Sequence, residues 1–328
     1  MVIRNAGKDQ RRRFRLAAQA ICLSTPQAAA GNLSFVIPFL HIWRLAIPTY
    51  GLMVAVGMVV AYYVLRADVT RRKLSVDPSS LAETFIAIPC LAGLVGSKLY
   101  SLLETPREFF ADPLGQLFSQ FGFTWVGGFI AGAVVYIWLA RRRRIPLLVM
   151  LDVASPAAAI GYAFGRMGCL LSGDGDYGIP TSLPWGMTFP NGLVPTTERV
   201  HPTPVYEFIV ACLTAWVLWR MGTRSVAHSK LEKRISAANQ RTSNSQPPIS
   251  LLWAGTASAG QIFAAYLVLA GAARFLVEFI RINPRVFLGM TNAQVASIVS
   301  MIAGVVLWWH LSATKKSNPD KKPRSKTA

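Results

Sequence analysis

The chain has 328 residues, of which 52% are hydrophobic and only 15% are charged, and 34 Lys and Arg residues face 15 Asp and Glu residues. A soluble domain carries about 25% charged residues, and a disordered basic chain would lack the apolar half, so the composition argues against both classes. The net charge of +19 would by itself also fit a nucleic-acid-binding protein. The positions of the basic residues decide between these readings.

Most of the basic residues lie in short clusters. Of the 34 Lys and Arg residues, 26 fall in the segments 4–15, 66–73, 141–144, 220–241 and 315–326. Between the clusters run stretches close to the ~20 apolar residues that span a bilayer as a helix. Clusters of this kind mark the cytoplasmic side of a membrane protein. We therefore expect a polytopic membrane protein, with no nucleic acid needed to explain its charge.

In chain order, residues 1–44 form an N-terminal extension that is either a signal-like or anchor segment or a dispensable addition. Seven apolar segments follow, each suited to a transmembrane helix: 48–65, 81–103, 124–140, 147–170, 203–219, 252–274 and 292–311. The predicted fold class is all-α, a polytopic membrane helix bundle with about seven transmembrane helices. If the first span runs from outside to inside, the basic clusters after it and the C-terminus all lie in the cytoplasm.

The spans predict a transmembrane domain at 45–312 with an outer loop at 172–200. Residues 221–250, rich in Ser, Asn, Gln, Lys and Arg, read as a solvated cytoplasmic loop, and 313–328 as a basic cytoplasmic tail. The four cysteines and four histidines show neither disulfide nor metal-ligand spacing. No metal site and no cofactor is predicted.

Three arginines, Arg166, Arg274 and Arg281, lie within or at the ends of predicted spans. A charge in the bilayer costs about 2.5–3.5 kcal/mol on insertion scales, so such a residue usually faces a polar cavity and marks a functional site. Arg274, Glu278 and Arg281 are spaced to share one helix face. Further acidic residues gather nearby: Asp152, Asp174, Asp176 and Glu207.

Five sequence motifs accompany these charges: YGLM at 50–53, GFTWVGGFIAG at 122–132, GRMGCLLSGDGDYG at 165–178, HPTPVYE at 201–207 and ARFLVEFIR at 273–281. In this order the set resembles the bacterial prolipoprotein diacylglyceryl transferase family, over about residues 45–312. The family's G-R-x-G-N signature aligns with 165–169, its H-P-x-x-x-Y-E stretch with 201–207, and its R-x-x-x-E-x-x-R stretch with 274–281. Asp152 fits the family's Asp ahead of the signature.

The resemblance implies an inner-membrane enzyme that transfers a diacylglyceryl group from phosphatidylglycerol to the lipobox cysteine thiol of prolipoproteins and releases glycerol phosphate. Its implied partners are phosphatidylglycerol, prolipoprotein signal peptides and membrane lipids, and its active site faces the outer, periplasmic side. Arg166 and Arg274 would hold the lipid phosphate, for which a planar, permanently charged guanidinium is suited. The other implied substrate-binding residues are Tyr50, Cys169, Asp174, Gly178 and His201.

The sequence also departs from the family pattern. Val126 stands where the family has a His before Gly-Gly, Cys169 replaces the signature's Asn, Asp174 replaces a Glu, and Lys98 replaces an Arg. The family His would suit removal of the thiol proton. We hypothesise that a carboxylate, Glu207 or Glu278, replaces it; His201 is another candidate, and the field of the arginines could instead lower the thiol pKa.

Several alternatives stay open from the sequence alone. Arg274, Glu278 and Arg281 could form only a structural ion-pair ladder. Cys169 could be a nucleophile or a small buried residue. The whole chain could also move a lipid-derived group to another acceptor, or bind lipid without catalysis.

Overall fold

The computed structural model describes residues 36–43, 45–74, 76–119, 122–239, 259–286 and 288–316. Each predicted span overlaps a helix: α2 (Thr49–Arg72), α3 (Pro78–Glu104), α6 (Trp125–Arg142), α7 (Leu147–Ser172), α8 (Thr203–Asn239), α10 (Gln261–Val277) and α11 (Asn292–Lys316). Within the described ranges, five of these helices are long and apolar enough to cross a membrane. The predicted all-α membrane bundle is confirmed.

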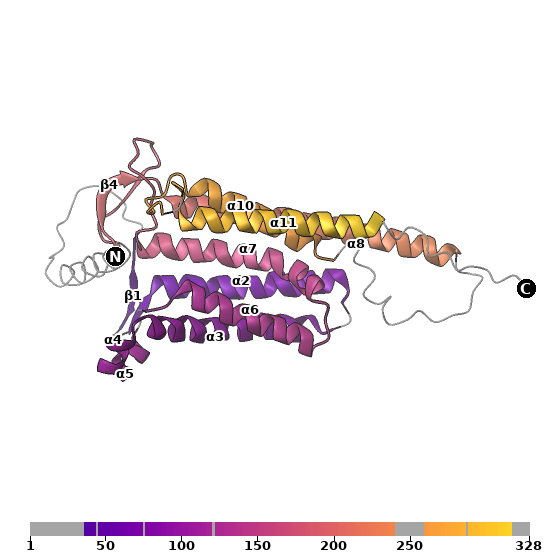
Figure 1. Cartoon of the computed structure of the whole chain (residues 1–328), viewed down its shortest axis with the longest axis horizontal. Helices are drawn as coiled ribbons and strands as arrows, with labels where there is room; N and C mark the ends of the chain where they lie inside the picture. The colour runs from indigo at the N-terminus through magenta and orange to yellow at the C-terminus, as the bar shows by residue number, and fades with distance from the viewer. Residues whose placement is uncertain are drawn as a thin grey trace, which may run out of the picture.

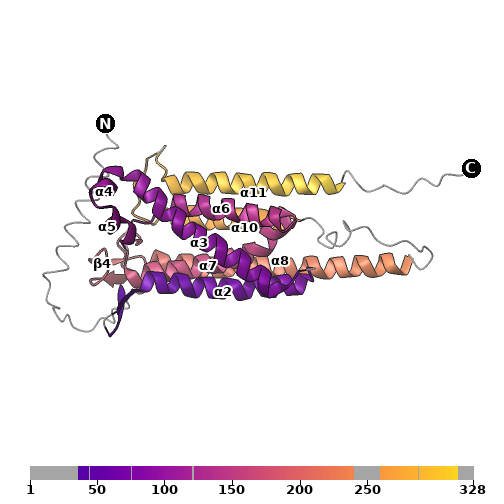
Figure 2. The ribbon, with the colours of Figure 1, turned by 90° about the horizontal axis from the view of Figure 1, so that it is seen from below.

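The long helices lie side by side along the long axis of the molecule (Figures 1 and 2). Helix α7 packs against α2, α8 and α10; α2 also packs on α3, α3 on α6, and α10 on α11. One end of the bundle carries β1 (Phe39–Ile42), β4 (Thr196–Val200), α4 (Pro106–Ala111) and α5 (Pro113–Phe118), at the left in Figure 1. We call it the loop end, and the opposite end, where α2 and α6 finish in pairs of arginines, the basic end.

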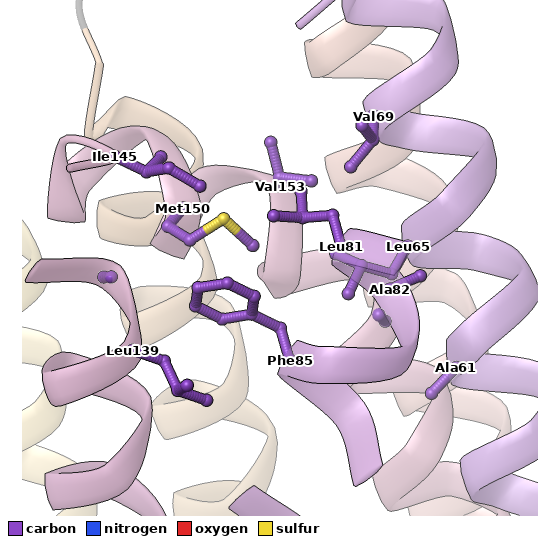
Figure 3. Close-up of a cluster of buried hydrophobic side chains, with 12 residues drawn as sticks. Ala61, Leu65, Val69, Leu81, Ala82, Phe85, Leu139, Ile145, Met150 and Val153 are labelled. Atoms are coloured by element: carbon purple, nitrogen blue, oxygen red, sulfur yellow. The ribbon is translucent and has the colours of Figure 1, made fainter. Parts of the chain in front are cut away.

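The largest group of buried apolar side chains lies toward the basic end, between α2, α3, α6 and α7 (Figure 3). The Phe85 ring of α3 and the Met150 side chain of α7 point toward each other there, with Val153 beside them. The Tyr136 hydroxyl donates to the Met150 carbonyl at 2.9 Å, so the buried phenol has a partner. This packing holds the helix directions on which the loop end depends.

Small residues let α3 and α6 approach closely. A Cβ on Gly96 would come within 2.7 Å of the Gly127 carbonyl oxygen, and one on Gly127 would collide with the Gly96 carbonyl oxygen. Close contact of small residues is a common way for membrane helices to associate. The Gly127-Gly128 pair of the motif at 122–132 therefore has a packing role.

The loop end contains two short antiparallel hairpins that the sequence reading did not predict. Strand β1 pairs with β2 (Leu45–Pro48), and β3 (Met187–Phe189) pairs with β4. Gly173 ends α7 with a left-handed φ of 60°, which glycine adopts without steric cost. Tyr177 then stacks on Phe189, with ring centroids 4.2 Å apart. These contacts fix residues 173–178 over the end of α7.

Helix α8 continues to Asn239, so the first part of the predicted loop 221–250 is helical. The rest of that loop, most of the extension 1–44 and the tail from residue 317 lie outside the described residues.

Candidate functional site

Three arginines and three carboxylates from separate segments meet at the loop end of the bundle, and we call them the arginine–carboxylate cluster. Its members are Arg166 of α7, Asp176 of the loop after α7, Glu207 of α8, Arg274 of α10, and Glu278 and Arg281 at and after the end of α10. Arginine and carboxylate are equal in number, as expected where charges leave water.

Glu207 is the centre of the cluster. Its Oε1 accepts from Arg274 Nη1 at 2.7 Å and from the Tyr162 hydroxyl at 2.9 Å. Its Oε2 accepts from Arg166 Nη1 and Arg281 Nη1, each at 3.3 Å. The side chain is only 3% exposed. Both oxygens of this buried carboxylate are therefore engaged by arginines.

Asp176 joins two arginines from different segments. Its Oδ2 lies 2.5 Å from Arg166 Nη1, and its Oδ1 accepts from Arg281 Nη2. The Thr203 hydroxyl at the start of α8 donates to the Asp176 carbonyl at 2.5 Å. Burial raises the pKa of the Asp176 carboxyl, but the charges of Arg281 and Arg166 outweigh it and hold that pKa below its usual range.

The three arginines differ in exposure. Arg281 is 5% exposed in its side chain, whereas Arg166 is 20% and Arg274 is 27% exposed. Arg274 Nη2 lies 2.9 Å from Oε2 of the fully buried Glu278, whose Oε1 accepts from Asn283. Arg281 therefore lies inside the cluster, while the side chains of Arg166 and Arg274 stay part-exposed.

Gly178 holds the outer loop against the ends of α8 and α10. Its N–H donates to the His201 carbonyl at 2.9 Å, and the next N–H, of Ile179, donates to the Ile280 carbonyl at 2.8 Å. A Cβ on Gly178 would lie 2.7 Å from both His201 Cβ and the Ile280 oxygen. The glycine is needed for this close approach, which positions Asp176 two residues earlier.

Cys169 and Asp174 lie beside the cluster. The buried thiol of Cys169 lies within 4.8 Å of the Asp174 carboxylate, whose Oδ1 accepts from the Asp176 N–H at 3.2 Å. Burial, and then the charge of Asp176, raise the pKa of the Asp174 carboxyl. Tyr50 is 47% exposed and packs against Gly168, next to this pair.

A sulfur and two carboxylates come together here, which raises the question of a metal. The ligand atoms of Cys169, Asp174 and Asp176 all lie within 4.8 Å of one another. Both oxygens of Asp176 already accept from arginines, and the nearby positive charges oppose a cation. We therefore propose no metal at this position.

The His201 ring is held by other groups. Its Nδ1 lies 3.1 Å from the Tyr206 hydroxyl, which also accepts from Trp185 Nε1 at 2.7 Å. Of the contacts found in the described residues, none links this ring to the cluster arginines. His201 contributes to the site through its backbone, which binds Gly178.

The remaining residues that matched or departed from the family pattern lie on other elements. Val126 is 43% exposed in the first turn of α6, which packs on α3. Lys98 of α3 donates to the Ser119 carbonyl at 2.9 Å. Asp152 lies near the basic end, where its two oxygens accept from the Gly260 and Phe263 N–H groups at 2.7 Å each, so it caps α10.

The sequence reading placed Arg166, Arg274, Glu207 and Glu278 in one site, and the structure brings them together. The sequence did not predict that Asp176 pairs with arginines or that Tyr162 joins the site. Tyr162 precedes Arg166 by one helical turn, and the Arg166 guanidinium lies 5.1 Å from its ring. That i, i+4 spacing was the available signal; nothing local marked Asp176 as an arginine partner.

Comparison with known proteins gives a consistent result. The family model of prolipoprotein diacylglyceryl transferase matches residues 38–238 and 248–310. A phosphatidylglycerol–prolipoprotein diacylglyceryl transferase of Clostridium tetani is 27% identical, over 82% of this chain and 94% of the relative. Those of Geobacter sulfurreducens and Bordetella bronchiseptica are each 29% identical, over 77% and 82% of this chain and 84% and 92% of the relative. The chain therefore belongs to the prolipoprotein diacylglyceryl transferase family.

Proposed function

We propose that this chain transfers a diacylglyceryl group from phosphatidylglycerol to the thiol of the lipobox cysteine in a prolipoprotein signal peptide. The observation that carries the proposal is the arginine–carboxylate cluster, in which Arg166 and Arg274 are part-exposed while their carboxylate partner Glu207 is buried. The names of the relatives, which specify phosphatidylglycerol and prolipoprotein, support the same substrates.

The reaction needs a positive site for the phosphate. The thiol sulfur bonds to the glyceryl carbon that carries the phosphate ester, the carbon–oxygen bond breaks, and its electron pair leaves on the oxygen of glycerol phosphate. The thiol proton passes to a base. Negative charge grows on the departing phosphate, and preorganised donors stabilise such charge best where water is excluded. Arg166 and Arg274 are proposed to bind the phosphate in this way.

Glu207 and Glu278 are proposed to belong to the catalytic machinery because they hold these arginines. Glu207 contacts Arg166 and Arg274, and Glu278 contacts Arg274. A guanidinium fixed by a buried carboxylate loses less freedom on binding a phosphate. The sequence also raised the alternative that either glutamate takes the thiol proton, and E207Q and E278Q test that alternative.

The remaining substrate-binding residues are proposed to shape the pocket around the lipid headgroup. Tyr50, Cys169 and Asp174 lie beside the arginines, and Gly178 and His201 hold the loop over them.

The proposed orientation places the basic end in the cytoplasm. Helices α2 and α6 finish there in Arg71, Arg72, Arg141 and Arg142, which the positive-inside rule assigns to the cytoplasmic side. The cluster, at the other end, then faces the periplasm from the bacterial inner membrane, where other membrane lipids surround it. We propose the domain division accordingly: the extension 1–44, the transferase domain 45–312 and the cytoplasmic tail 313–328.

The test uses the purified full-length chain in vesicles with labelled phosphatidylglycerol and a lipobox peptide. Transfer of label to the peptide cysteine, lost in R274A and kept in R285A, is the expected result; Arg285 is exposed and outside the cluster. Consumption of lipid without peptide labelling would instead favour another acceptor. Binding of lipid without turnover would favour a catalytically silent lipid-binding protein.

A further inference from the structure

One carboxylate of the site is not held by an arginine. In the described part of the chain, Asp176, Glu207 and Glu278 each form ion pairs with arginines. Asp174 forms none there. Its carboxylate accepts a hydrogen bond from the Asp176 backbone N–H, and the Cys169 thiol lies within 4.8 Å of it. An oxygen already bound to a guanidinium is a poor proton acceptor because protonation would break the ion pair. Of these four carboxylates, Asp174 therefore has the most oxygen lone pairs available to accept a proton.

Asp174 also lies beside a thiol. The Sγ of Cys169 and the carboxylate oxygens of Asp174 and Asp176 lie within 4.8 Å of one another. The side chain of Asp174 is half-buried, unlike the buried Cys169. The exposed part of Asp174 is where a second thiol, from a bound peptide, would approach.

We propose that Asp174 is the proton acceptor for the incoming cysteine thiol. This rests on the proposed function and names its missing base. The thiol proton moves to the Asp174 carboxylate, the thiolate attacks the glyceryl carbon, and the carbon–oxygen electron pair leaves on the phosphate oxygen held by Arg166. The proton on Asp174 then passes to water or to the released glycerol phosphate, which restores the carboxylate.

The surroundings of Asp174 suit this role. Burial and the charge of Asp176 raise the pKa of its carboxyl, and a base works best when its pKa approaches the working pH. The ionisable groups that face it are Cys169 and Arg166 of α7, Tyr50 of α2, and Asp176 and Tyr177 of its own loop. The charge of Arg166 opposes this rise.

The same geometry argues against Cys169 as a covalent carrier of the lipid group. Attack by its sulfur would give a thioether, and a thioether carbon–sulfur bond has no phosphate leaving group to release the glyceryl unit to a second thiol. Alkylated Cys169 would be a dead-end product. The negative charge of the neighbouring Asp174 carboxylate instead favours the protonated, less nucleophilic form of this thiol.

The experiment measures transfer to a lipobox peptide by full-length protein in phosphatidylglycerol vesicles between pH 6 and pH 9. At pH 7, D174N is expected to lower kcat about 100-fold, with the KM for phosphatidylglycerol changed little. The deficit should shrink as the pH approaches the thiol pKa of about 8.5, because the thiolate then forms without a base. D174E, which keeps a carboxylate, should recover most of the activity, and E198Q, which removes an exposed charge from strand β4, should change neither quantity.

A peptide with selenocysteine in place of the acceptor cysteine gives an independent readout. Its selenol is ionised at neutral pH, so D174N should use it nearly as well as the unaltered protein does. E207Q and E278Q, which loosen the arginines, should stay impaired with this peptide and at every pH.

Two results would overturn the inference: wild-type kcat in D174N, or a D174N deficit that neither alkaline pH nor the selenol peptide reduces. Alkaline recovery in E207Q or E278Q instead of D174N would assign the proton to a glutamate. Absence of transfer by the unaltered protein would count against the proposed function itself. If D174N does not fold, D174E is measured in its place. The inference then requires that D174E is active and that the acidic side of its pH–activity profile is shifted.

Discussion

Arginine and carboxylate side chains meet at both ends of this helix bundle, and the two groups differ in what they leave exposed. At the basic end, Asp68 of α2 is fully buried and binds Arg71 and Arg72, whose side chains are 17% and 2% exposed. Arg71 also donates to the Trp219 carbonyl of α8 at 2.8 Å and lies 3.8 Å from the centroid of that tryptophan ring. We call this group the Asp68 anchor. At the loop end, Arg166 and Arg274 remain part-exposed.

The comparison separates two uses of arginine in a membrane protein. In the Asp68 anchor, Arg72 is buried and Arg71 binds the Trp219 carbonyl of α8, so the anchor joins α2 to α8 and we expect its main effect on stability. The arginine–carboxylate cluster encloses Glu207 and Glu278 and leaves the side chains of Arg166 and Arg274 part-exposed, and the proposed function gives it a role in ligand binding. The arginines of the Asp68 anchor lie at the basic end, where the positive-inside rule predicts them. The arginines of the arginine–carboxylate cluster lie at the other end, where that rule does not predict them, so a functional role is expected for them.

The largest expected effect is on activity, from the loop end. R166A should lower kcat by about 10²–10³-fold, the usual result of removing one preorganised donor that stabilises developing charge. R166K should recover little, because an ammonium group cannot reproduce the forked contacts to Asp176 and a phosphate. Transfer to a lipobox peptide is the measurement, with R285A as the matched control. Undiminished kcat in R166A would show that the cluster has only a structural role.

The next effect is on stability, from the basic end. D68N should destabilise the protein by about 3 kcal/mol, since it leaves Arg72 buried without its carboxylate. The measurement is the apparent melting temperature in detergent, compared with E83Q, which removes an exposed charge from α3. Transfer activity per folded molecule should be unchanged. Loss of activity without loss of stability in D68N would remove the distinction between the two ends.

A smaller effect is expected at the loop that covers the cluster. G178A should cost about 1–3 kcal/mol, because overpacking forces neighbouring groups to shift. The new methyl group would meet His201 and the Ile280 carbonyl, so the KM for phosphatidylglycerol should rise as well. G165A is the control for stability, since a Cβ at Gly165 meets nothing within 4 Å. Equal melting temperatures for the two variants would contradict this account.

The smallest effect is expected from the cap of α10. D152N keeps an oxygen acceptor but loses charge and one acceptor, so the cost should be about 1 kcal/mol, as for other helix N-caps. D152A should cost more. Because Asp152 lies near the basic end, kcat should fall less than tenfold in both variants. A loss as large as that of R166A would instead place Asp152 in the catalytic machinery.

The spans could be predicted from the sequence because apolar length is a local property. The sequence also predicted that one helix face carries Arg274, Glu278 and Arg281, because their spacing along a helix sets the direction of their side chains. The sequence did not predict that the segment after Thr223 begins as a helix, because its polar composition resembles that of a solvated loop.

The partners of the charges were beyond local patterns. Asp176 meets Arg281 although 105 residues separate them, and only the packing of α7, α8 and α10 brings them together. Asp152 looked like a site residue by its place ahead of the signature, but it caps a helix 108 residues later in the chain. Asp174 was placed in the substrate site, while its freedom from arginine became visible only once the other carboxylates were paired.

The central claim is that the loop end carries the group transfer. The most direct test is the stoichiometry of products from the purified protein, phosphatidylglycerol and a lipobox peptide, measured by mass spectrometry. One glycerol phosphate released for each diacylglyceryl thioether formed on the peptide cysteine, with both products abolished in the R166A/R274A double variant and retained in D68N, is the predicted result. Release of glycerol phosphate without the thioether, or both products at undiminished rate in R166A/R274A, would contradict the account.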